Sequence, residues 1–254
     1  MKTPFRFQQF EVRDQGSAMK IGTDGVLLGS WAPIRDAHTI VDIGTGCGLI
    51  ALMIGQRTVA QRAMVRAIDV DRDAAQQAHE NFLASPWRDR LPSNVDQIHT
   101  SLQDFADDLD EGSRFDLAVC NPPYFSNDFL PSRDARRVAR HTSLLPRRSL
   151  FLNSFRVVKP AGRLCLVLPY EQAAETIEVA LETGFSLWTR TDVRPNPAGQ
   201  LKRVLLEFGR QAFDCADRDL VHDELVVEVT RNQFTDDYRA LTEQFHLRFA
   251  KDRR

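Results

Sequence analysis

The tetrapeptide Asn121-Pro122-Pro123-Tyr124 has the residue types needed to hold a weakly nucleophilic nitrogen. An amine conjugated to a purine ring, like an amide nitrogen, has a delocalised lone pair and needs help to react. If Asn121 Oδ1 and the Pro122 carbonyl each accept one N–H bond, the lone pair is directed at an incoming electrophile, and the proline rings fix the carbonyl direction. Tyr124 offers an aromatic face to a planar substrate. We predict Asn121, Pro122 and Tyr124 as catalytic residues and Pro123 as a substrate contact.

A glycine-rich run, Gly44-Thr45-Gly46-Cys47-Gly48, follows the apolar stretch 39–43. Glycines at the end of a strand permit positive φ and close approach of a ligand, and N–H groups at the start of the next helix favour an anionic group. A dinucleotide fingerprint is GxGxxG, whereas this spacing is GxGxG. The run therefore favours S-adenosylmethionine over NAD, and Gly44, Thr45, Gly46 and Gly48 are the predicted cofactor contacts.

An acidic residue, Asp69, closes the next predicted strand, 21 residues after Gly48. At that position in doubly wound folds a carboxylate accepts hydrogen bonds from the ribose hydroxyls of a nucleotide. Asp71 is predicted to cap the following helix. Ser101 and Leu102, in the turn after the third predicted strand, are the expected contacts of the adenine ring.

Residues 126–150 hold six arginines against two aspartates. A long connection of this kind, directly after the tetrapeptide, is either functional or a solvated surface loop. Arginine clusters steer and bind RNA phosphates. We predict Arg133, Arg136, Arg137 and Arg140 as RNA contacts.

The elements that position these motifs alternate between strands and helices, which is typical of a parallel sheet covered on both faces. We expect strands at 39–43, 63–68, 95–99, 115–120, 163–168, 185–193 and 201–208, and helices at 49–56, 72–84, 148–158 and 170–183. The turn-rich segment 194–199 predicts that the last two strands pair as an antiparallel hairpin at one sheet edge. The predicted fold class is α/β, a doubly wound, mainly parallel seven-stranded sheet, in which the first and fourth strands flank the ligand crevice.

Shorter elements are expected at the two ends of the chain. Residues 5–12 are strand-like, and Thr23 or Asp24 is expected to cap a helix that ends at Trp31. Residues 224–229 and 235–249 predict a strand and an amphipathic helix. We therefore predict an N-terminal lid segment at 1–35, a main domain at 36–210, and a C-terminal strand and helix at 211–254 that pack on it.

The 254 residues are 43% hydrophobic and 27% charged, with a net charge of −2, which is the balance of an ordinary globular protein. The sequence has no apolar run of the ~18 residues that a membrane span needs. Its first residues also lack the apolar region of a signal peptide. Four widely spaced cysteines predict reduced thiols and no metal site. We expect a cytoplasmic, monomeric protein without an obligate protein partner.

The glycine run, Asp69 and the tetrapeptide together resemble the class I S-adenosylmethionine-dependent methyltransferases that modify amine or amide nitrogens, over about residues 39–170. That resemblance implies a Rossmann-like fold and S-adenosylmethionine as cofactor. More narrowly, the runs 19–28, 140–141, 202–208 and 234–238 resemble the bacterial tRNA(Val) adenine N6-methyltransferases, which act on adenine 37, just 3′ of the anticodon. Gly25, where alanine is expected, and Thr142, where an acid is commoner, depart from that family.

The resemblance implies transfer of a methyl group to adenine N6 in tRNA. Two alternatives within the superfamily stay open, because an amide nitrogen presents the same chemical problem: a protein-glutamine N5-methyltransferase and an rRNA guanine N2-methyltransferase. A DNA adenine methyltransferase would need a larger target-recognition domain. A noncatalytic RNA-binding or cofactor-sensing module is disfavoured by the intact tetrapeptide.

Overall fold

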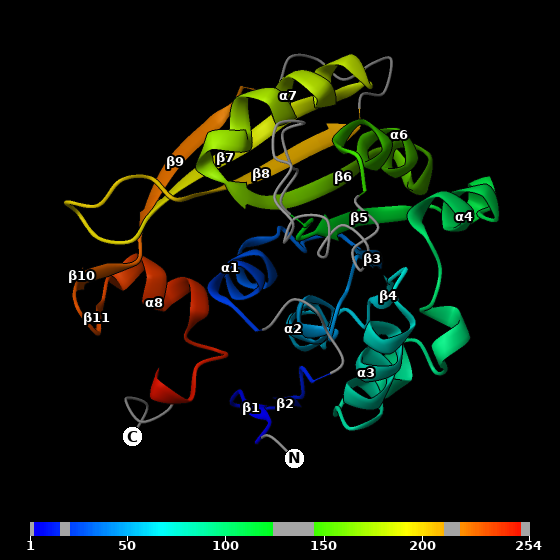
Figure 1. The fold of residues 1–254 in the computed structure, drawn as a ribbon, viewed down its shortest axis with the longest axis horizontal. Helices are drawn as coiled ribbons and strands as arrows, with labels where there is room; N and C mark the ends of the chain where they lie inside the picture. The colour runs from blue at the N-terminus through cyan, green and yellow to red at the C-terminus, as the bar shows by residue number, and fades with distance from the viewer. Residues whose placement is uncertain (1–2, 16–20, 124–144, 211–218, 250–254) are drawn as a thin grey trace, which may run out of the picture.

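The computed structural model describes residues 3–15, 21–123, 145–210 and 219–249. Its centre is a seven-stranded sheet in the order β4-β3-β5-β6-β8-β7-β9 (Figure 1). The strands are β3 Thr39–Ile43, β4 Met64–Ile68, β5 Phe115–Cys120, β6 Val158–Pro169, β7 Phe185–Arg194, β8 Arg203–Arg210 and β9 Val221–Val226. β8 is antiparallel to both of its neighbours, and the other neighbouring pairs are parallel. The predicted fold class is confirmed.

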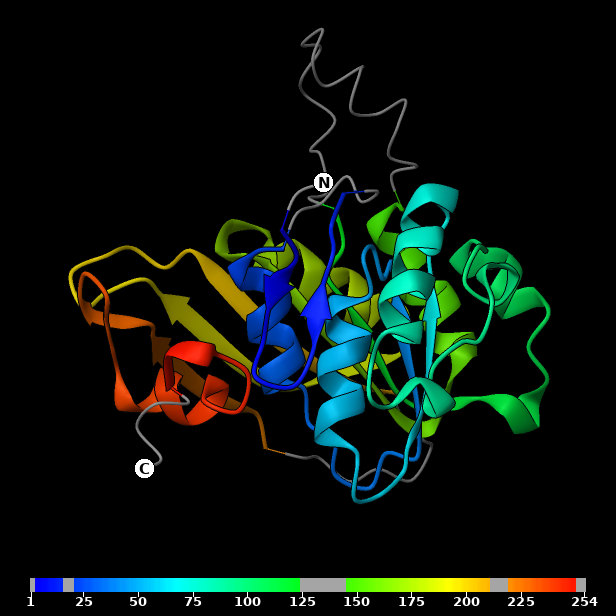
Figure 2. The same ribbon diagram turned by 90° about the horizontal axis from the view of Figure 1, so that it is seen from below.

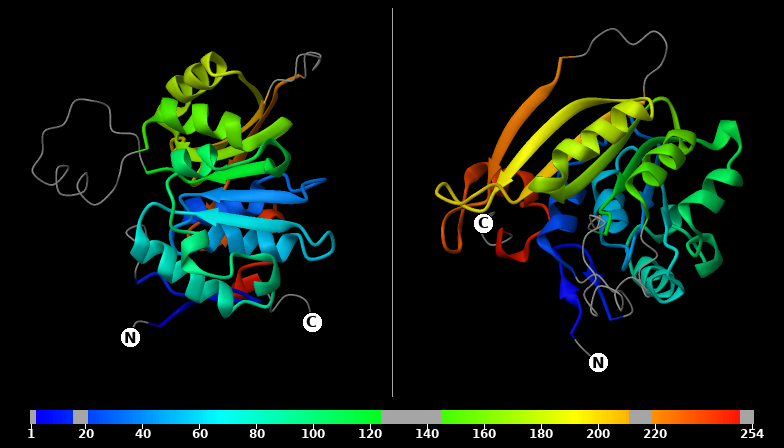
Figure 3. Two further views of the ribbon diagram at one scale, coloured as in Figure 1. Left: turned by 90° about the vertical axis from the view of Figure 1, so that its right-hand side faces the viewer. Right: turned by 45° about the horizontal axis from the view of Figure 1, so that its top comes forward.

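Helices cover both faces of the sheet because strand side chains alternate between two apolar cores. One core takes Ile40 and Leu117, and the other takes Val41 and Ala118. The first core is covered by α1 Thr23–Trp31, α2 Leu49–Arg57 and α3 Arg72–Leu83. The second is covered by α4 Leu102–Asp107, α6 Arg147–Val157 and α7 Ala173–Glu182. Figures 1 and 3 show these two helical layers on either side of the sheet.

Three neighbouring parallel strands end at the same level. Ile43, the last residue of β3, pairs with Ile68 of β4 and with Cys120 of β5. The residues that follow these three strand ends are Gly44, Asp69 and Asn121. The predicted proximity of the first and fourth strands is therefore confirmed, and the three motifs lie at one edge of the sheet.

The predicted strand at 95–99 is wrong. Val95–Gln97 forms a short 3-10 helix, because the Asn94 side chain accepts a hydrogen bond from Gln97 N and caps it. The segment makes one isolated parallel β-bridge, between His99 and Asp69, the residue that follows β4. Further 3-10 helices lie at Arg88–Arg90, Glu111–Ser113 and Tyr170–Gln172.

β9 supplies the seventh strand by pairing along its whole length with β7. The β7–β8 hairpin forms as predicted, but it lies inside the sheet, so its predicted place at the edge is wrong. The expected strand at 224–229 is divided between β9 and β10 Glu228–Thr230.

The N-terminal residues form a small hairpin, β1 Phe5–Arg6 and β2 Glu11–Val12, in place of one continuous strand. Gly22 occupies the cap position of α1 and no side chain caps that helix. The predicted cap at Thr23 or Asp24 is therefore wrong, because both residues lie inside the first turn.

The C-terminal residues continue through β11 Gln233–Phe234 into α8 Asp236–Thr242, which is shorter than predicted. Gln8 Nε2 donates to the carbonyls of Glu243 and His246, and Gln56 Nε2 donates to Gln244 O at 3.0 Å. Figure 2 shows the hairpin and the C-terminal residues on the side of the sheet that carries α1 and α2. Within the described residues, no helix combines the length and apolar character that crossing a membrane requires. The domain boundaries stay a prediction.

Two glycines of the run offer a matched test of packing. Gly44 and Gly48 have φ of +68° and +83°, but an added Cβ meets nothing within 4 Å at Gly44 and lies 2.4 Å from Phe82 Cε1 at Gly48. We expect Gly44→Ala to lower the free energy of unfolding by about 1–2 kcal/mol through backbone strain. Gly48→Ala should cost about 1–3 kcal/mol more because Phe82 must move. Urea unfolding measures both, Phe82→Leu should relieve part of the Gly48→Ala loss, and equal losses in the two alanine variants would contradict this account.

Candidate active site

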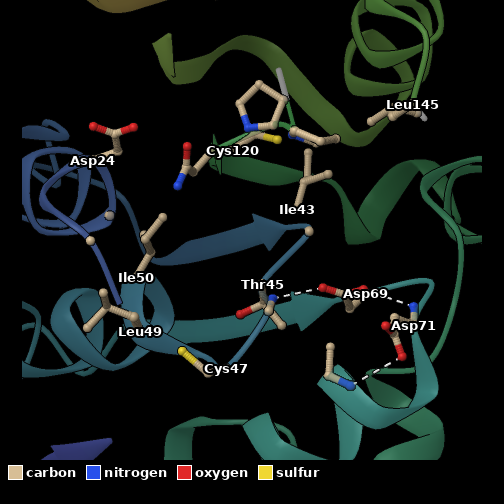
Figure 4. A pocket seen from close by; sticks show the side chains of 18 of the residues that line it. Asp24, Ile43, Thr45, Cys47, Leu49, Ile50, Asp69, Asp71, Cys120 and Leu145 are labelled. Atoms are coloured by element: carbon tan, nitrogen blue, oxygen red, sulfur yellow. Dashed lines mark hydrogen bonds between the residues drawn. The ribbon is translucent and has the colours of Figure 1, made fainter. Parts of the chain in front are cut away.

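A cavity of about 1500 Å³ opens at the level ends of β4, β3 and β5. Nine of the predicted site residues line it: Gly44, Thr45, Gly46, Asp69, Ser101, Leu102, Asn121, Pro122 and Pro123. Figure 4 shows several of the lining side chains converging from different elements on one space. The predicted cofactor and substrate motifs thus share a single cavity, while the role of each residue stays a prediction.

The remaining predicted residues lie elsewhere. Gly48 is absent from the cavity wall and packs on Phe82 of α3. Its predicted cofactor contact stays a prediction, and in the structure it lies against α3. Tyr124 and the four predicted RNA contacts, Arg133, Arg136, Arg137 and Arg140, lie outside the described residues.

Most backbone N–H groups of the glycine run donate hydrogen bonds within the protein. Within the described residues, the hydrogen bonds run from Gly44 N and Thr45 N to Ile68 O, from Gly46 N to Asp69 Oδ2, and from Gly48 N to Thr45 O, at 2.8–2.9 Å. The Cys47 N–H makes no hydrogen bond to another described residue, and Cys47 lines the cavity. The turn therefore presents one backbone donor and not the array of donors that its glycines suggest.

Asp42, which we did not predict as a site residue, accepts hydrogen bonds from a residue of this turn and from one in the helix that follows it. Its side chain is fully buried, and Oδ2 accepts from Thr45 Oγ1 at 2.6 Å and from Ala51 N at 3.1 Å. Asp42 thereby caps α2, because Gly48 at the cap position has no side chain. Oδ1 has no hydrogen-bond partner among the described residues, and burial raises the pKa of Asp42 to about 7. A lone acid in an otherwise apolar strand was the available signal in the sequence.

Asp69 holds the turn from the side. Its Oδ2 accepts from Gly46 N at 2.8 Å and its Oδ1 accepts from Asp71 N at 2.9 Å, as the dashed lines in Figure 4 show. Burial raises the pKa of Asp69 above its ordinary value. A carboxylate oxygen has two lone pairs, so each Asp69 oxygen keeps acceptor capacity toward the cavity. Asp71 caps α3 through Asp73 N at 2.8 Å, which confirms its predicted cap.

Ser101 and Leu102 line the cavity from the start of α4. Ser101 is the cap of that helix, and its Oγ accepts from Asp104 N at 3.1 Å. Leu102 is buried in the core under α4. This wall therefore offers an apolar surface next to a helix start whose first turn is already capped.

The opposite wall contains residues that sequence reasoning did not assign to the site. Asp24 of α1 accepts hydrogen bonds from Arg203 Nε on both carboxylate oxygens at 2.9 Å. Lys202, directly before β8, lines the same wall. Figure 4 shows Asp24 across the cavity from Asp69. The two partners of this ion pair are 179 residues apart, and no spacing rule could have joined them.

The fold and cavity place the chain in a known class of enzymes. Residues 17–191 match the model of the family described as Methyltransferase small domain. The crystal structure of a predicted O-methyltransferase from Agrobacterium tumefaciens superposes with a TM-score of 0.58 at 20% sequence identity, covering 87% of this chain and 96% of that one. The chain is a methyltransferase with the class I fold.

Its relatives narrow this class further. A tRNA1(Val) (adenine(37)-N6)-methyltransferase from Phocaeicola vulgatus is 39% identical over 243 residues, which cover 96% of this chain and 97% of the relative. One from Salmonella arizonae is 40% identical over 243 residues, covering 96% of this chain and 94% of the relative. The chain belongs to the tRNA1(Val) (adenine(37)-N6)-methyltransferase family, which confirms the resemblance seen in its sequence.

The buried Asp42 predicts a pH dependence of stability. Its pKa rises from 3.8 to about 7 on folding, so between these pH values the folded state holds a proton that the unfolded state has lost. Each such proton lowers the free energy of unfolding by up to about 1.4 kcal/mol per unit of rising pH. We expect Asp42→Asn to remove this decline. The free energy of unfolding of wild type minus that of the variant should therefore be larger at pH 4.5 than at pH 7. Urea unfolding at both pH values measures the two margins, and a constant margin would contradict the assignment.

Proposed function

We propose that this enzyme transfers a methyl group from S-adenosylmethionine to the exocyclic N6 of adenine 37 in tRNA1(Val). The observation that carries the proposal is that the glycine run and Asn121-Pro122-Pro123 line one cavity, at the ends of the paired strands β3 and β5. The names of the relatives support the nucleoside and the tRNA. A tRNA substrate implies that the enzyme acts in the cytoplasm, and we propose that it acts as a monomer.

The cavity residues that follow β3 and β4, together with those at the start of α4, fit S-adenosylmethionine. An added Cβ at Gly44 would stand in open space, so the backbone there leaves room for close approach of a ligand. Cys47 N–H would donate to an anionic group, and the Asp69 oxygens would accept from ribose hydroxyls. Ser101 and Leu102 would flank the adenine ring. When bound, the cofactor supplies an electrophilic methyl group.

The residues after β5 would hold the amine that receives this methyl group. Asn121 Oδ1 and the Pro122 carbonyl would each accept one N6–H bond, which directs the nitrogen lone pair away from the purine ring. Pro122 is buried and Asn121 is half-buried, so both are held by their surroundings. Tyr124 would stack on the base and Pro123 would contact it. Transfer forms the N–CH₃ bond, breaks the S–CH₃ bond and releases a proton, and positioning with two acceptor dipoles accounts for it without a strong base.

The size of the cavity supports the presence of two ligands. Its volume of about 1500 Å³ exceeds the ~300–1000 Å³ of a typical small-molecule site. The wall formed by Asp24, Lys202 and Arg203 lies beyond the cofactor motifs and would face the flipped adenine and its backbone. The arginine-rich segment 126–147 lies just after the tetrapeptide and would contact the flanking phosphates.

Replacing Asn121 separates chemistry from cofactor binding. We expect Asn121→Ala to slow methyl transfer by about 100-fold or more with nearly unchanged affinity for S-adenosylmethionine. The comparison variant Asp69→Ala should instead weaken cofactor binding by about 1.5–3 kcal/mol. Calorimetric titration and single-turnover transfer of a labelled methyl group to tRNA measure the two effects. Loss of cofactor binding in Asn121→Ala, with transfer retained in the remaining complex, would contradict the assigned role.

The identity of the methyl acceptor is tested on nucleosides. Purified enzyme is incubated with labelled S-adenosylmethionine, total protein and total RNA from a strain that lacks the enzyme, and the tRNA, rRNA and protein are separated and digested. Labelled N6-methyladenosine is expected. Labelled glutamine would favour the protein-modifying alternative, and labelled N2-methylguanosine would favour the guanine-modifying one.

Charge removal in the arginine-rich segment tests RNA binding. Replacing Arg133, Arg136, Arg137 and Arg140 together by glutamine should weaken tRNA binding and reduce the slope of log K against log salt by about 0.7–0.9 for each lost phosphate contact. Filter binding over a salt series measures the slope, with cofactor titration as the control. Unchanged tRNA affinity and slope would show that these four residues make no phosphate contacts.

A further inference from the structure

Asn81 of α3 joins two segments that are remote in sequence. Its side chain is buried, 4% exposed, and Nδ2 donates to Cys47 O and to Arg13 O, each at 2.8 Å. Oδ1 accepts from Arg13 N at 3.0 Å. One amide group therefore contacts both the glycine run and the residue that follows β2.

This arrangement needs the chemistry of an amide. Asn81 uses both of its N–H groups as donors and its oxygen as an acceptor, and the partners are backbone groups whose own chemistry is fixed. Aspartate has the same shape and supplies only acceptors. Leucine has a similar volume and supplies neither, so both changes would leave the Cys47 carbonyl without this partner.

The two residues that Asn81 binds, Arg13 and Cys47, belong to different parts of the molecule. Arg13 follows the N-terminal hairpin, which is anchored in the core where Phe10 packs edge-on against Trp87 at 5.7 Å between ring centroids. Cys47 is 5% exposed and lines the cavity. Its N–H is the one in the run 44–48 that makes no hydrogen bond within the described residues. The Asn81 hydrogen bond to Cys47 O therefore holds a residue of the cavity wall.

We propose that Asn81 is a positioning residue that couples the N-terminal hairpin to cofactor binding, an inference that rests on the proposed binding of S-adenosylmethionine in this cavity. Asn81 holds Cys47 in the conformation that binds the cofactor, and the same side chain holds the hairpin at Arg13. Linkage makes this coupling reciprocal. A bound cofactor restrains Cys47, and through Asn81 it restrains the hairpin.

Two variants of Asn81 and one control test the coupling in the full chain. Asn81→Leu removes all three hydrogen bonds, and Asn81→Asp keeps the acceptor for Arg13 N while removing both donors. Gln56→Met is the matched control, because Gln56 is also a buried amide that holds a terminal segment, through Gln244 O, and does not line the cavity. Circular dichroism and thermal unfolding first establish that each variant is folded.

Calorimetry with S-adenosylmethionine alone should show Kd raised about tenfold in both Asn81 variants, the size of effect expected for one lost orienting hydrogen bond, and less than about twofold in Gln56→Met. Hydrogen exchange read by mass spectrometry should show that the cofactor slows exchange at residues 3–15 in wild type and in Gln56→Met, and not in Asn81→Leu. Unchanged Kd in the folded Asn81 variants, or cofactor-dependent protection of residues 3–15 in Asn81→Leu, would overturn the coupling. Neither measurement uses tRNA, so failure of the proposed substrate is detected separately, by the nucleoside assay.

Discussion

The level ends of three parallel strands are the constraint on which the site depends. Parallel pairing places Ile43 beside Ile68 and Cys120, so whatever follows each strand must emerge at the same edge of the sheet. A shift of two residues in either pairing would move a motif by more than 6 Å along the strand direction. Gly44, Asp69 and Asn121, which follow the three strand ends, are thus aligned by main-chain hydrogen bonds before any side chain contributes.

Buried polar groups then refine what the strands align. Asp42 caps α2 and holds Thr45, while Asp69 ties the glycine run to the turn after β4. Both carboxyls lie in surroundings that disfavour their charged forms, and burial raises both pKa values. Groups of this kind are tolerated because they fix a turn that an apolar core cannot shape. In this protein three of the four hydrogen bonds donated by the N–H groups of the glycine run go to Ile68 and Asp69, so the run is fixed to the end of β4.

The parts of the fold that depend on local pattern could be predicted from the sequence. The strands that end at Ile43, Ile68 and Cys120, and the glycine run after the first, follow from apolar runs bounded by turn residues. The strand proposed at 95–99 failed because Asn94 provides a local cap that competes with pairing. Contacts between residues remote in the chain could not be predicted, because they depend on the assembled tertiary structure. Examples are β9 beside β7, Arg203 on Asp24, and Arg13 on Asn81.

The meeting of the two chain ends has a consequence for synthesis on the ribosome. Gln8 is synthesised 235 residues before its carbonyl partner Glu243 and 238 residues before its carbonyl partner His246. Strands β3, β4 and β5 all lie within residues 39–120, so β3 can pair with β4 and β5 while translation continues. The hairpin of β1 and β2 therefore lacks these two contacts until the residues that follow α8 have been made. A nascent chain can therefore form the glycine run 44–48 between β3 and α2 well before Gln8 has its native partners.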